Sequence, residues 1–142
     1  MSSGSIEVKI PEGVEPLTQG SAESAGWDIR SSQKVTLDPK SPTLLDTGFK
    51  CEIQPGFGLL LLSRSKLASE GFTVEGGVID SDYRGFVKVI LHNHTKNPKV
   101  IQKGERIAQA WFLPVPHIQW IKANELTTTD RGQHGFGSTG TT

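Results

Sequence analysis

The sequence predicts an all-β domain, a sandwich or barrel built from short strands. Sixteen glycines and eight prolines divide the 142 residues into short segments. The apolar runs between these breaks are rich in Val, Ile, Leu and Phe, which favour strands. No segment repeats apolar residues with a helical period over three or more turns. A chain of this length forms one core and is too short for two ordinary domains.

The expected strands follow one another at the spacing typical of a sandwich or barrel. Turn signals such as Asp38-Pro39, Arg84-Gly85 and Lys103-Gly104 separate them. One short helix is expected at residues 65–70, with Gly71 placed to end it. The predicted strands are residues 6–10, 27–30, 34–37, 44–53, 58–62, 72–75, 86–93, 99–101, 106–113 and 118–122.

The last stretch of the chain, residues 127–142, differs in kind from the rest. It is made mainly of Gly, Thr and Ser and shows no strand alternation. Because such a segment cannot bury enough surface to hold its own shape, we expect a flexible C-terminal arm. The remainder, residues 1–126, is expected to form a single domain whose first five residues are disordered.

Composition excludes several classes of protein. Lys plus Arg equals Asp plus Glu at 15 each, which argues against a surface that coats nucleic acid. The single cysteine, Cys51, excludes a disulfide framework and suits a reducing compartment. The longest apolar run, residues 59–62, is far too short to span a membrane, and no apolar signal core follows the N-terminus. We therefore expect a cytoplasmic or nuclear protein with no membrane or nucleic-acid partner.

The two strands 86–93 and 106–113 carry apolar residues on both faces. A small monomer rarely covers both faces of several strands, so part of this surface is expected to meet a partner chain. The pattern therefore favours an oligomer.

Residues 131–140 (Arg-Gly-Gln-His-Gly-Phe-Gly-Ser-Thr-Gly) form the most distinctive segment. Its glycines, with Ser138 and Thr139, offer backbone N–H groups and hydroxyls as donors to phosphate oxygens. Arg131 adds a permanently charged fork for the same oxygens, and Phe136 is suited to stack on a base. The segment predicts an arm that closes over a nucleotide. Taken alone, it equally fits a flexible linker.

Residues 76–85 predict a tight hairpin whose turn begins at Asp80 and whose second strand starts at Phe86. One of the two carboxylates, Asp80 or Asp82, could act as general base on a water molecule. Tyr83 could pack flat against a sugar. The alternative is an Asp-rich turn whose carboxylates cap backbone amides.

Two further segments carry charged residues that could bind an ion, an anion at the first and a cation at the second. Arg64, Ser65 and Lys66 occupy the first turn of the predicted helix, where free N–H groups favour an anion. The alternative there is an ordinary N-cap by Ser63 or Ser65. Asp28 stands inside an otherwise apolar strand, so it needs a cation, an arginine or turn amides as partner.

Two other pairs complete the candidates. Arg106 and Gln109 are predicted on opposite faces of one strand and therefore to have different roles. His92 and His94 have the spacing of metal ligands, but no cysteine or third histidine lies near them in the sequence. No metal site is predicted at these two residues.

These five segments, in this order, resemble the five motifs of the trimeric dUTPase family (dUTP nucleotidohydrolases). The motifs are matched by Ala-Gly-Trp-Asp-Ile (25–29), Arg-Ser-Lys-Leu-Ala (64–68), Gly-Val-Ile-Asp-Ser-Asp-Tyr-Arg-Gly (77–85), Gly-Glu-Arg-Ile-Ala-Gln (104–109) and the segment 131–140. The match covers nearly the whole chain, and motifs three and five are long and specific.

The resemblance implies a distorted jelly-roll-like β fold and a homotrimer whose three active sites are shared between subunits. It implies hydrolysis of dUTP to dUMP and pyrophosphate with Mg²⁺, which keeps uracil out of DNA and supplies dUMP for thymidylate synthesis. Asp80 would activate the water that attacks the α-phosphate, and Asp28 would be linked to Mg²⁺ through water. By the same resemblance, the backbone of Gly77, Val78 and Ile79 would bind the uracil edge, and Tyr83 would pack on the deoxyribose. Arg64, Ser65, Lys66 and Gln109 would bind phosphates, and Lys88 matches a position that lies at the site in some members. In the arm, Arg131 would bind the γ-phosphate, Phe136 would stack over uracil, and Gly137, Ser138 and Thr139 would line the phosphates.

The sequence departs from the family pattern at three positions without losing a catalytic role. Lys66 stands where the family usually has Gly, Trp27 replaces Tyr or Phe, and Phe86 stands where a polar residue is common. The related dCTP deaminase branch is disfavoured because motif five is complete and Asp80 stands in place of Glu. A module that works only through protein contacts would be expected to have lost Asp80, Tyr83 or the arm.

Overall fold

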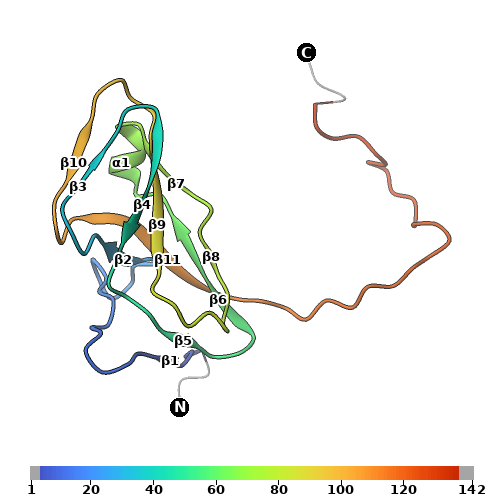
Figure 1. The fold of residues 1–142 in the computed structure, drawn as a ribbon. Coiled ribbons are helices and arrows are strands. Elements are labelled where there is room, and N and C mark those ends of the chain that lie inside the picture. Colours follow the sequence, from blue (N-terminus) through green and yellow to red (C-terminus); the bar gives the residue numbers. More distant parts are fainter. Residues whose placement is uncertain (1–3, 138–142) are drawn as a thin grey trace.

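A computed structural model describes residues 4–137 and consists of short strands with a single helix (Figure 1). This confirms the predicted all-β class. The elements in chain order are β1 Val8–Lys9, β2 Trp27–Arg30, β3 Val35–Leu37, β4 Ser41–Asp46, β5 Glu52–Ile53, β6 Phe57–Leu62, α1 Ser65–Ser69, β7 Phe72–Glu75, β8 Val78–Ile79, β9 Lys88–Asn93, β10 Lys99–Ile101 and β11 Arg106–Pro114.

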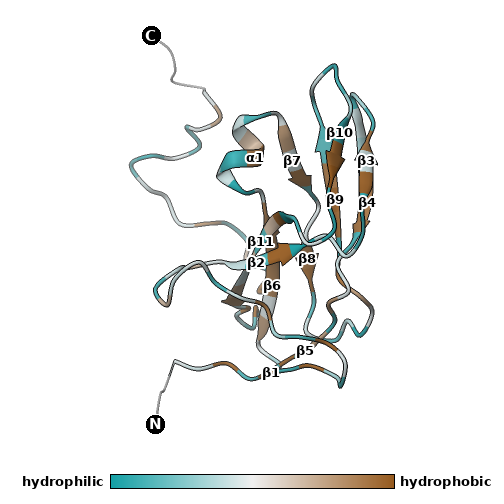
Figure 2. Cartoon of the chain, turned by 90° about the vertical axis from the view of Figure 1, so that its left-hand side faces the viewer, coloured by the Kyte–Doolittle hydropathy of each residue, from teal (hydrophilic) through white to brown (hydrophobic). Residues whose placement is uncertain are grey.

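Two larger sheets and two strand pairs form the domain, and every pairing is antiparallel. The first sheet has the order β2-β11-β6-β8 and the second the order β4-β9-β7. Strand β1 pairs with β5, and β10 with β3. Figure 2 shows apolar residues concentrated on the strands and polar ones along many connections. Both sheets supply fully buried side chains to the core, among them Ile29, Leu59, Ile107, Val89 and Leu91.

Helix α1 follows β6 and is anchored by one buried side chain, Leu67. It ends as predicted at Gly71, whose φ of 100° is a left-handed conformation that glycine adopts without penalty. The alternative of a serine N-cap is wrong. Arg64 occupies the cap position without a side-chain cap bond, and the Ser63 hydroxyl instead accepts a hydrogen bond from the backbone N–H of Val74.

Two predicted strands differ from the structure. The run 44–53 is divided between β4 and β5 because Gly48, with a φ of 69°, turns the chain between them. Residues 118–122 form no strand, since they lie in a segment that leaves the domain after β11 (Figure 1).

The predicted hairpin around Asp80 is also wrong. Strand β8 pairs with β6, whereas β9 pairs with β4 and β7 in the other sheet. The connection between β8 and β9 therefore crosses from one sheet to the other. A hydrogen bond of 2.7 Å from the Val87 N–H to the Phe49 carbonyl anchors its far end.

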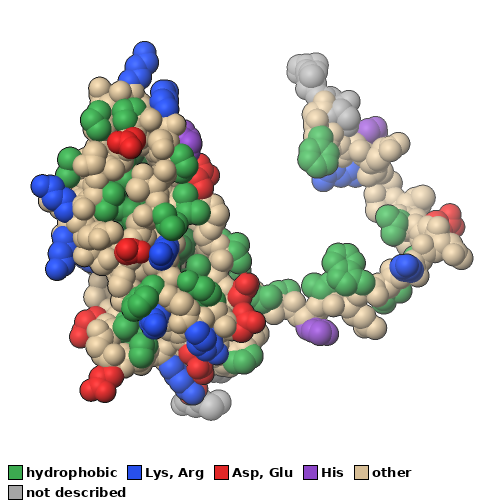
Figure 3. All heavy atoms as spheres, viewed as in Figure 1, with side chains coloured by type: hydrophobic (Ala, Val, Ile, Leu, Met, Phe, Trp, Pro, Cys, Tyr) green, Lys and Arg blue, Asp and Glu red, His purple; other side chains and the backbone are tan. Residues whose placement is uncertain are grey.

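The N–H of Val115 still donates a 2.8 Å hydrogen bond to the Gly56 carbonyl, and the chain beyond it extends away from the domain (Figures 1 and 3). Several large apolar side chains along it are exposed to solvent: Val115 by 54%, Ile118 by 58%, Trp120 by 91%, Ile121 by 76% and Leu126 by 88%. Extended backbone with this much exposed apolar surface is unfavourable for an isolated chain in water. Within residues 4–137, no helix is both long and apolar enough to cross a bilayer.

Candidate active site

Two surface pockets are lined by six of the predicted site residues: Asp28, Arg64 and Gln109 in one, and Val78, Ile79 and Asp80 in the other. One, of about 320 Å³, is lined by Asp28, Arg64 and Gln109 together with the loop 20–26. The other, of about 800 Å³, is lined by Val78, Ile79 and Asp80 on one side and by β6 and the end of β11 on the other. A single chain therefore brings motifs one, two and four together and places motif three in a separate pocket.

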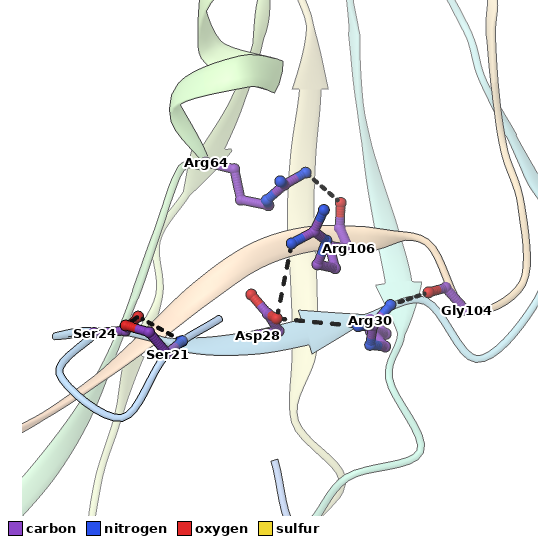
Figure 4. Close-up of polar contacts among 7 residues, drawn as sticks. All are labelled: Ser21, Ser24, Asp28, Arg30, Arg64, Gly104 and Arg106. Atoms are coloured by element: carbon purple, nitrogen blue, oxygen red, sulfur yellow. Dashed lines mark hydrogen bonds and ion pairs between the residues drawn. The ribbon is translucent and has the colours of Figure 1, made fainter. Parts of the chain in front are cut away.

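Asp28 lies among arginines at the first pocket (Figure 4). Its Oδ2 is 4.0 Å from Nη2 of Arg30 and 4.0 Å from Nη1 of Arg106, and the side chain is 19% exposed. Arg64 reaches the same cluster from the start of α1, where its Nη1 donates a 3.4 Å hydrogen bond to the Arg106 carbonyl. Three guanidinium groups against one carboxylate leave an excess of positive charge, which favours an anionic ligand.

A bulge in β11 places Arg106 and Gln109 on the same face, contrary to the prediction. Arg106 lies opposite Arg30 and Gln109 opposite Asp28, with the register shifted between Arg106 and Ala108. Arg30 and Asp28 are two residues apart on β2 and share a face, so their partners share it too. The extra residue of the bulge reverses the alternation that the sequence implies.

The amide of Gln109 has a fixed orientation. Its Nε2 donates to the Ser63 carbonyl at 3.0 Å, and its Oε1 accepts from the indole N–H of Trp111 at 3.1 Å. Gly26 packs against this amide, since a Cβ there would lie 2.5 Å from Oε1 of Gln109. The nitrogen of the amide therefore keeps one N–H free to face the pocket.

The turn after β8 presents a free carboxylate. Asp80 is exposed, and among the described residues its side chain has no hydrogen-bond or ion-pair partner. Only its backbone carbonyl is engaged, by the N–H of Tyr83 at 3.1 Å. Asp82 likewise caps no amide within residues 4–137, so the alternative of an Asp-capped turn is wrong.

Tyr83 is held over the backbone of its own turn. Its hydroxyl donates to the Phe86 carbonyl at 2.7 Å, and a Cβ on Gly85 would lie 2.7 Å from the ring Cζ. The ring is 43% exposed, so one side of it remains available for contact. Glycine at position 85 is required by this packing.

Gly77 fixes the approach of β8 to β6. Its carbonyl accepts a 2.7 Å hydrogen bond from the N–H of Leu61, and its φ is 104°. A Cβ there would lie 2.7 Å from the Leu61 carbonyl oxygen. Both the conformation and the contact require glycine, and they leave the neighbouring Val78 side chain 73% exposed.

Comparisons with known proteins show the family of the chain. The dUTPase family model matches residues 13–140. This chain belongs to the dUTPase family. The deoxyuridine 5'-triphosphate nucleotidohydrolase of Nautilia profundicola is 46% identical over 121 residues, which cover 83% of this chain and 85% of that protein. The enzyme of the same name from Debaryomyces hansenii is 42% identical over 87% of this chain and 79% of that protein.

Solved dUTPase structures confirm the predicted fold. The dUTPase of Staphylococcus bacteriophage 80alpha with dUPNHPP superposes with a TM-score of 0.84 at 26% identity, covering 98% of this chain and 100% of that one. A variant dUTPase of Staphylococcus aureus phage phi11, described with a structural Mg(II) ion, shares the fold with a TM-score of 0.74 at 21% identity, covering 85% and 97% of the two chains.

The remaining dUTPase site residues predicted from the sequence lie outside both pockets. Lys88 pairs with Asp46 across β4 and β9 at 3.5 Å. Ser65 and Lys66 are exposed at the start of α1. In the arm, Arg131 donates from Nε to the His134 carbonyl at 2.8 Å, Phe136 is fully exposed, and Gly137 has a φ of 79°. The predicted Ser138 and Thr139 fall outside the described residues.

Three residues that support the candidate site were missed from the sequence. Trp111 and the Ser63 carbonyl hold Gln109, and Arg30 shares Asp28 with Arg106. The spacing of two between Gln109 and Trp111 on one strand was a usable signal for their contact. The other contacts join residues distant in sequence and had no local signal.

Proposed function

We propose that the chain, a hydrolase of the dUTPase family, cleaves dUTP to dUMP and pyrophosphate. The named relatives at 42–46% identity are deoxyuridine 5'-triphosphate nucleotidohydrolases, and the phage 80alpha dUTPase was solved with a dUTP analogue. The observation that carries the proposal is the carboxylate of Asp80 beside the Val78–Ile79 backbone, which has no side-chain partner within residues 4–137. In a cell this reaction would keep uracil out of DNA and provide dUMP for thymidylate synthesis.

In the proposed mechanism Asp80 is the general base. Its carboxylate takes a proton from a water molecule as the water oxygen forms a bond to the α-phosphorus. The bond from that phosphorus to the bridging oxygen breaks, and pyrophosphate leaves with the electron pair. This carboxylate is exposed and no group in the described part of the chain competes for it, so it can accept the hydrogen bond from water.

The first pocket is proposed to hold the phosphates. The guanidinium of Arg64 and an N–H of Gln109 are the donors that face it. Ser65 and Lys66 follow Arg64 at the start of α1, outside the lining of the pocket, and are proposed to contact phosphates from there. The uracil edge is proposed to meet the backbone of Gly77, Val78 and Ile79, whose close packing on β6 fixes its position. The exposed face of the Tyr83 ring is suited to pack on the deoxyribose.

Magnesium fits this pocket only together with a triphosphate. Asp28 is the single carboxylate among the residues that line it, and two arginines flank that carboxylate. Mg²⁺ is commonly held by one or two carboxylates, water and phosphate oxygens, so Asp28 would hold it through water. When bound, the ion would offset negative charge on the departing pyrophosphate.

A homotrimer with shared active sites is the proposed assembly. The phosphate pocket and the Asp80 pocket are separate in one chain, so a complete site requires residues from a second copy. The exposed apolar side chains between Val115 and Leu126 support an arm that packs on another subunit. From there Arg131 and Phe136 could reach the γ-phosphate and the uracil of a neighbouring site, with Gly137, Ser138 and Thr139 along the phosphates.

A pyrophosphate-release assay across the deoxynucleoside triphosphates and UTP tests the proposed reaction. We expect release from dUTP with Mg²⁺ and little from dCTP, dTTP or UTP. Conversion of dCTP to a uracil nucleotide would instead assign the chain to deamination. Absence of turnover with dUTP by a folded protein would overturn the proposal.

A further inference from the structure

Glu75, His92 and His94 bring a carboxylate and two imidazoles together on the sheet β4-β9-β7. His92 lies on the face of β9 opposite the buried Val89 and Leu91, and His94 follows directly after the last residue of that strand. Glu75 lies on the neighbouring β7, which pairs with β9 in a register that sets Thr73 against His92. The three side chains are between 27% and 49% exposed, so solvent ions reach them.

The potential ligand atoms are close enough to share one ion. Oε1 of Glu75 is 3.8 Å from Nδ1 of His92 and 4.0 Å from Nε2 of His94. Candidate ligand atoms of all three residues lie within 4.8 Å of one another. Bonds of about 2.0–2.2 Å in a tetrahedral site set such atoms about 3.3 Å apart, so rotation of these exposed side chains would have to bring the ligand atoms closer and aim them at one ion.

The two imidazole rings are already arranged in parallel. Their centroids are 4.1 Å apart and their planes differ by 9°. The lone pair of an imidazole nitrogen lies in the plane of its ring, so at least one ring must turn out of this parallel arrangement before both nitrogens can bind one ion. The Thr73 hydroxyl, 2.7 Å from Nε2 of His94, would have to release that nitrogen.

We propose that Glu75, His92 and His94 form a binding site for a divalent first-row transition metal, with Zn²⁺ the best fit. Imidazole nitrogen suits Zn²⁺, Ni²⁺ and Cu²⁺, whereas Mg²⁺ and Ca²⁺ prefer sites made only of oxygen. Three protein ligands leave a fourth position for water, as in many zinc sites. This site is separate from Asp28 and from both pockets.

The ion would join β7 to β9 at a structurally sensitive point. Glu75 is the last residue of β7 and directly precedes Gly76 and Gly77, which lead into β8 and Asp80. Fixing Glu75 to β9 would restrain the start of that connection. The metal is therefore a structural cross-link and takes no part in the proposed hydrolysis.

Calorimetric titration of the metal-free full-length chain with Zn²⁺ tests the site, in buffer containing excess Mg²⁺. We expect one Zn²⁺ per chain. Binding should weaken at least about tenfold in Glu75→Gln, His92→Ala and His94→Ala, since loss of even an outer-shell partner has an effect of about 10–100-fold. Zn²⁺ should also raise the melting temperature of the unaltered chain and not that of these variants.

His117→Ala and His134→Ala are matched controls, because both histidines follow β11 in the chain and lie outside the cluster. Both variants should bind Zn²⁺ as the unaltered chain does. Equal loss of binding in these controls, full binding in all three cluster variants, or no binding by the unaltered chain would overturn the site. Circular dichroism verifies folding. If a histidine variant does not fold, the isosteric Glu75→Gln decides the outcome.

Discussion

The indole N–H of Trp111 donates a 3.1 Å hydrogen bond to Oε1 of Gln109, two residues earlier on the same face of β11. This bond leaves the nitrogen end of the amide pointing to the Ser63 carbonyl and the phosphate pocket. Trp111 is thus a positioning residue, since it touches the amide and does not line the pocket. Its effect on catalysis should pass entirely through Gln109.

Trp111→Phe should lower kcat/KM for dUTP by about 2–10-fold, the loss expected from one hydrogen bond of about 0.5–1.5 kcal/mol. The measurement is pyrophosphate release under steady-state conditions. In a Gln109→Ala background the same substitution should have almost no further effect. Independent, additive losses in the double variant would contradict a role through Gln109.

Gly77→Ala should destabilise the fold strongly. The new Cβ would lie 2.7 Å from the Leu61 carbonyl oxygen, and the alanine would have to adopt a φ of 104°. Gly13→Ala is the matched control, because Gly13 also has a positive φ of 88° but nothing lies within 4 Å of its Cβ position. We expect Gly13→Ala to cost about 1–2 kcal/mol and Gly77→Ala about 1–3 kcal/mol more.

The free energy of unfolding in urea, at one fixed chain concentration, measures both glycine variants. If both variants lost the same free energy of unfolding, the positive φ alone would account for the effect of Gly77→Ala. This outcome would remove the argument that Gly77 is required by its approach to β6.

Cys51 should make stability fall in alkaline solution. Burial raises the pKa of its thiol, and the positive charge of Arg84 offsets part of that rise. An unfolded thiol loses its proton near pH 8.5, while the folded one keeps it to higher pH. The folded state therefore binds more protons in that window, and its stability decreases as pH rises above about 8.5, by at most about 1.4 kcal/mol per pH unit.

Urea unfolding at about pH 7.5 and pH 9.5 checks the effect of Cys51. The Cys51→Ala variant lacks the thiol and should show a smaller decrease between the two pH values, whatever its overall stability. The same decrease in both proteins would assign the pH dependence to other groups.

Local patterns predicted most strands and the helix, because alternation, turn residues and the Gly71 stop act within a few residues. Pairing was not predictable in the same way. Strand β8 joins β6 through contacts with residues about twenty positions away, so the turn at Asp80 was misread as a hairpin. The bulge in β11 likewise reverses the face of Arg106, and no residue type in that strand marks it.

The five motifs identified the family, but the sequence could not show how the site residues are distributed. Asp80 and Gln109 line different pockets of one chain, and this follows from sheet topology alone. The sequence showed His92 and His94 as a pair but did not show that Glu75 lies beside them, because Glu75 belongs to a neighbouring strand.

Asp80→Asn should reduce dUTP turnover by about 10²–10⁴-fold, the usual contribution of a general base, and leave nucleotide affinity largely intact. Asp82→Asn is the matched control: this residue lies in the same turn and is also exposed and without a partner among residues 4–137. It should keep turnover within a few-fold. Single-turnover kinetics measure the effect on the chemical step, and binding of a non-hydrolysable analogue measures the effect on nucleotide affinity. Near-normal turnover in Asp80→Asn would end the assignment of the base.

Removal of residues 131–142 should leave a folded domain that hydrolyses dUTP poorly. The described part of this segment lies outside the core, with Phe136 fully exposed, so its loss removes no buried contact of the chain. Arg131→Ala alone should lower kcat/KM by about 10–100-fold, as expected for a lost charge-assisted hydrogen bond of about 1.5–3 kcal/mol.

The truncated chain should also lose discrimination between dUTP and dUDP. Ordering the arm costs about 1 kcal/mol or more for each fixed residue, so closure is favourable only when a γ-phosphate adds contacts. Competitive binding of dUDP and a non-hydrolysable triphosphate, measured with and without residues 131–142, checks this expectation. If the truncated protein kept both full activity and the triphosphate preference, the selection would have to come from Arg64 and Gln109, and the arm would have no part in it.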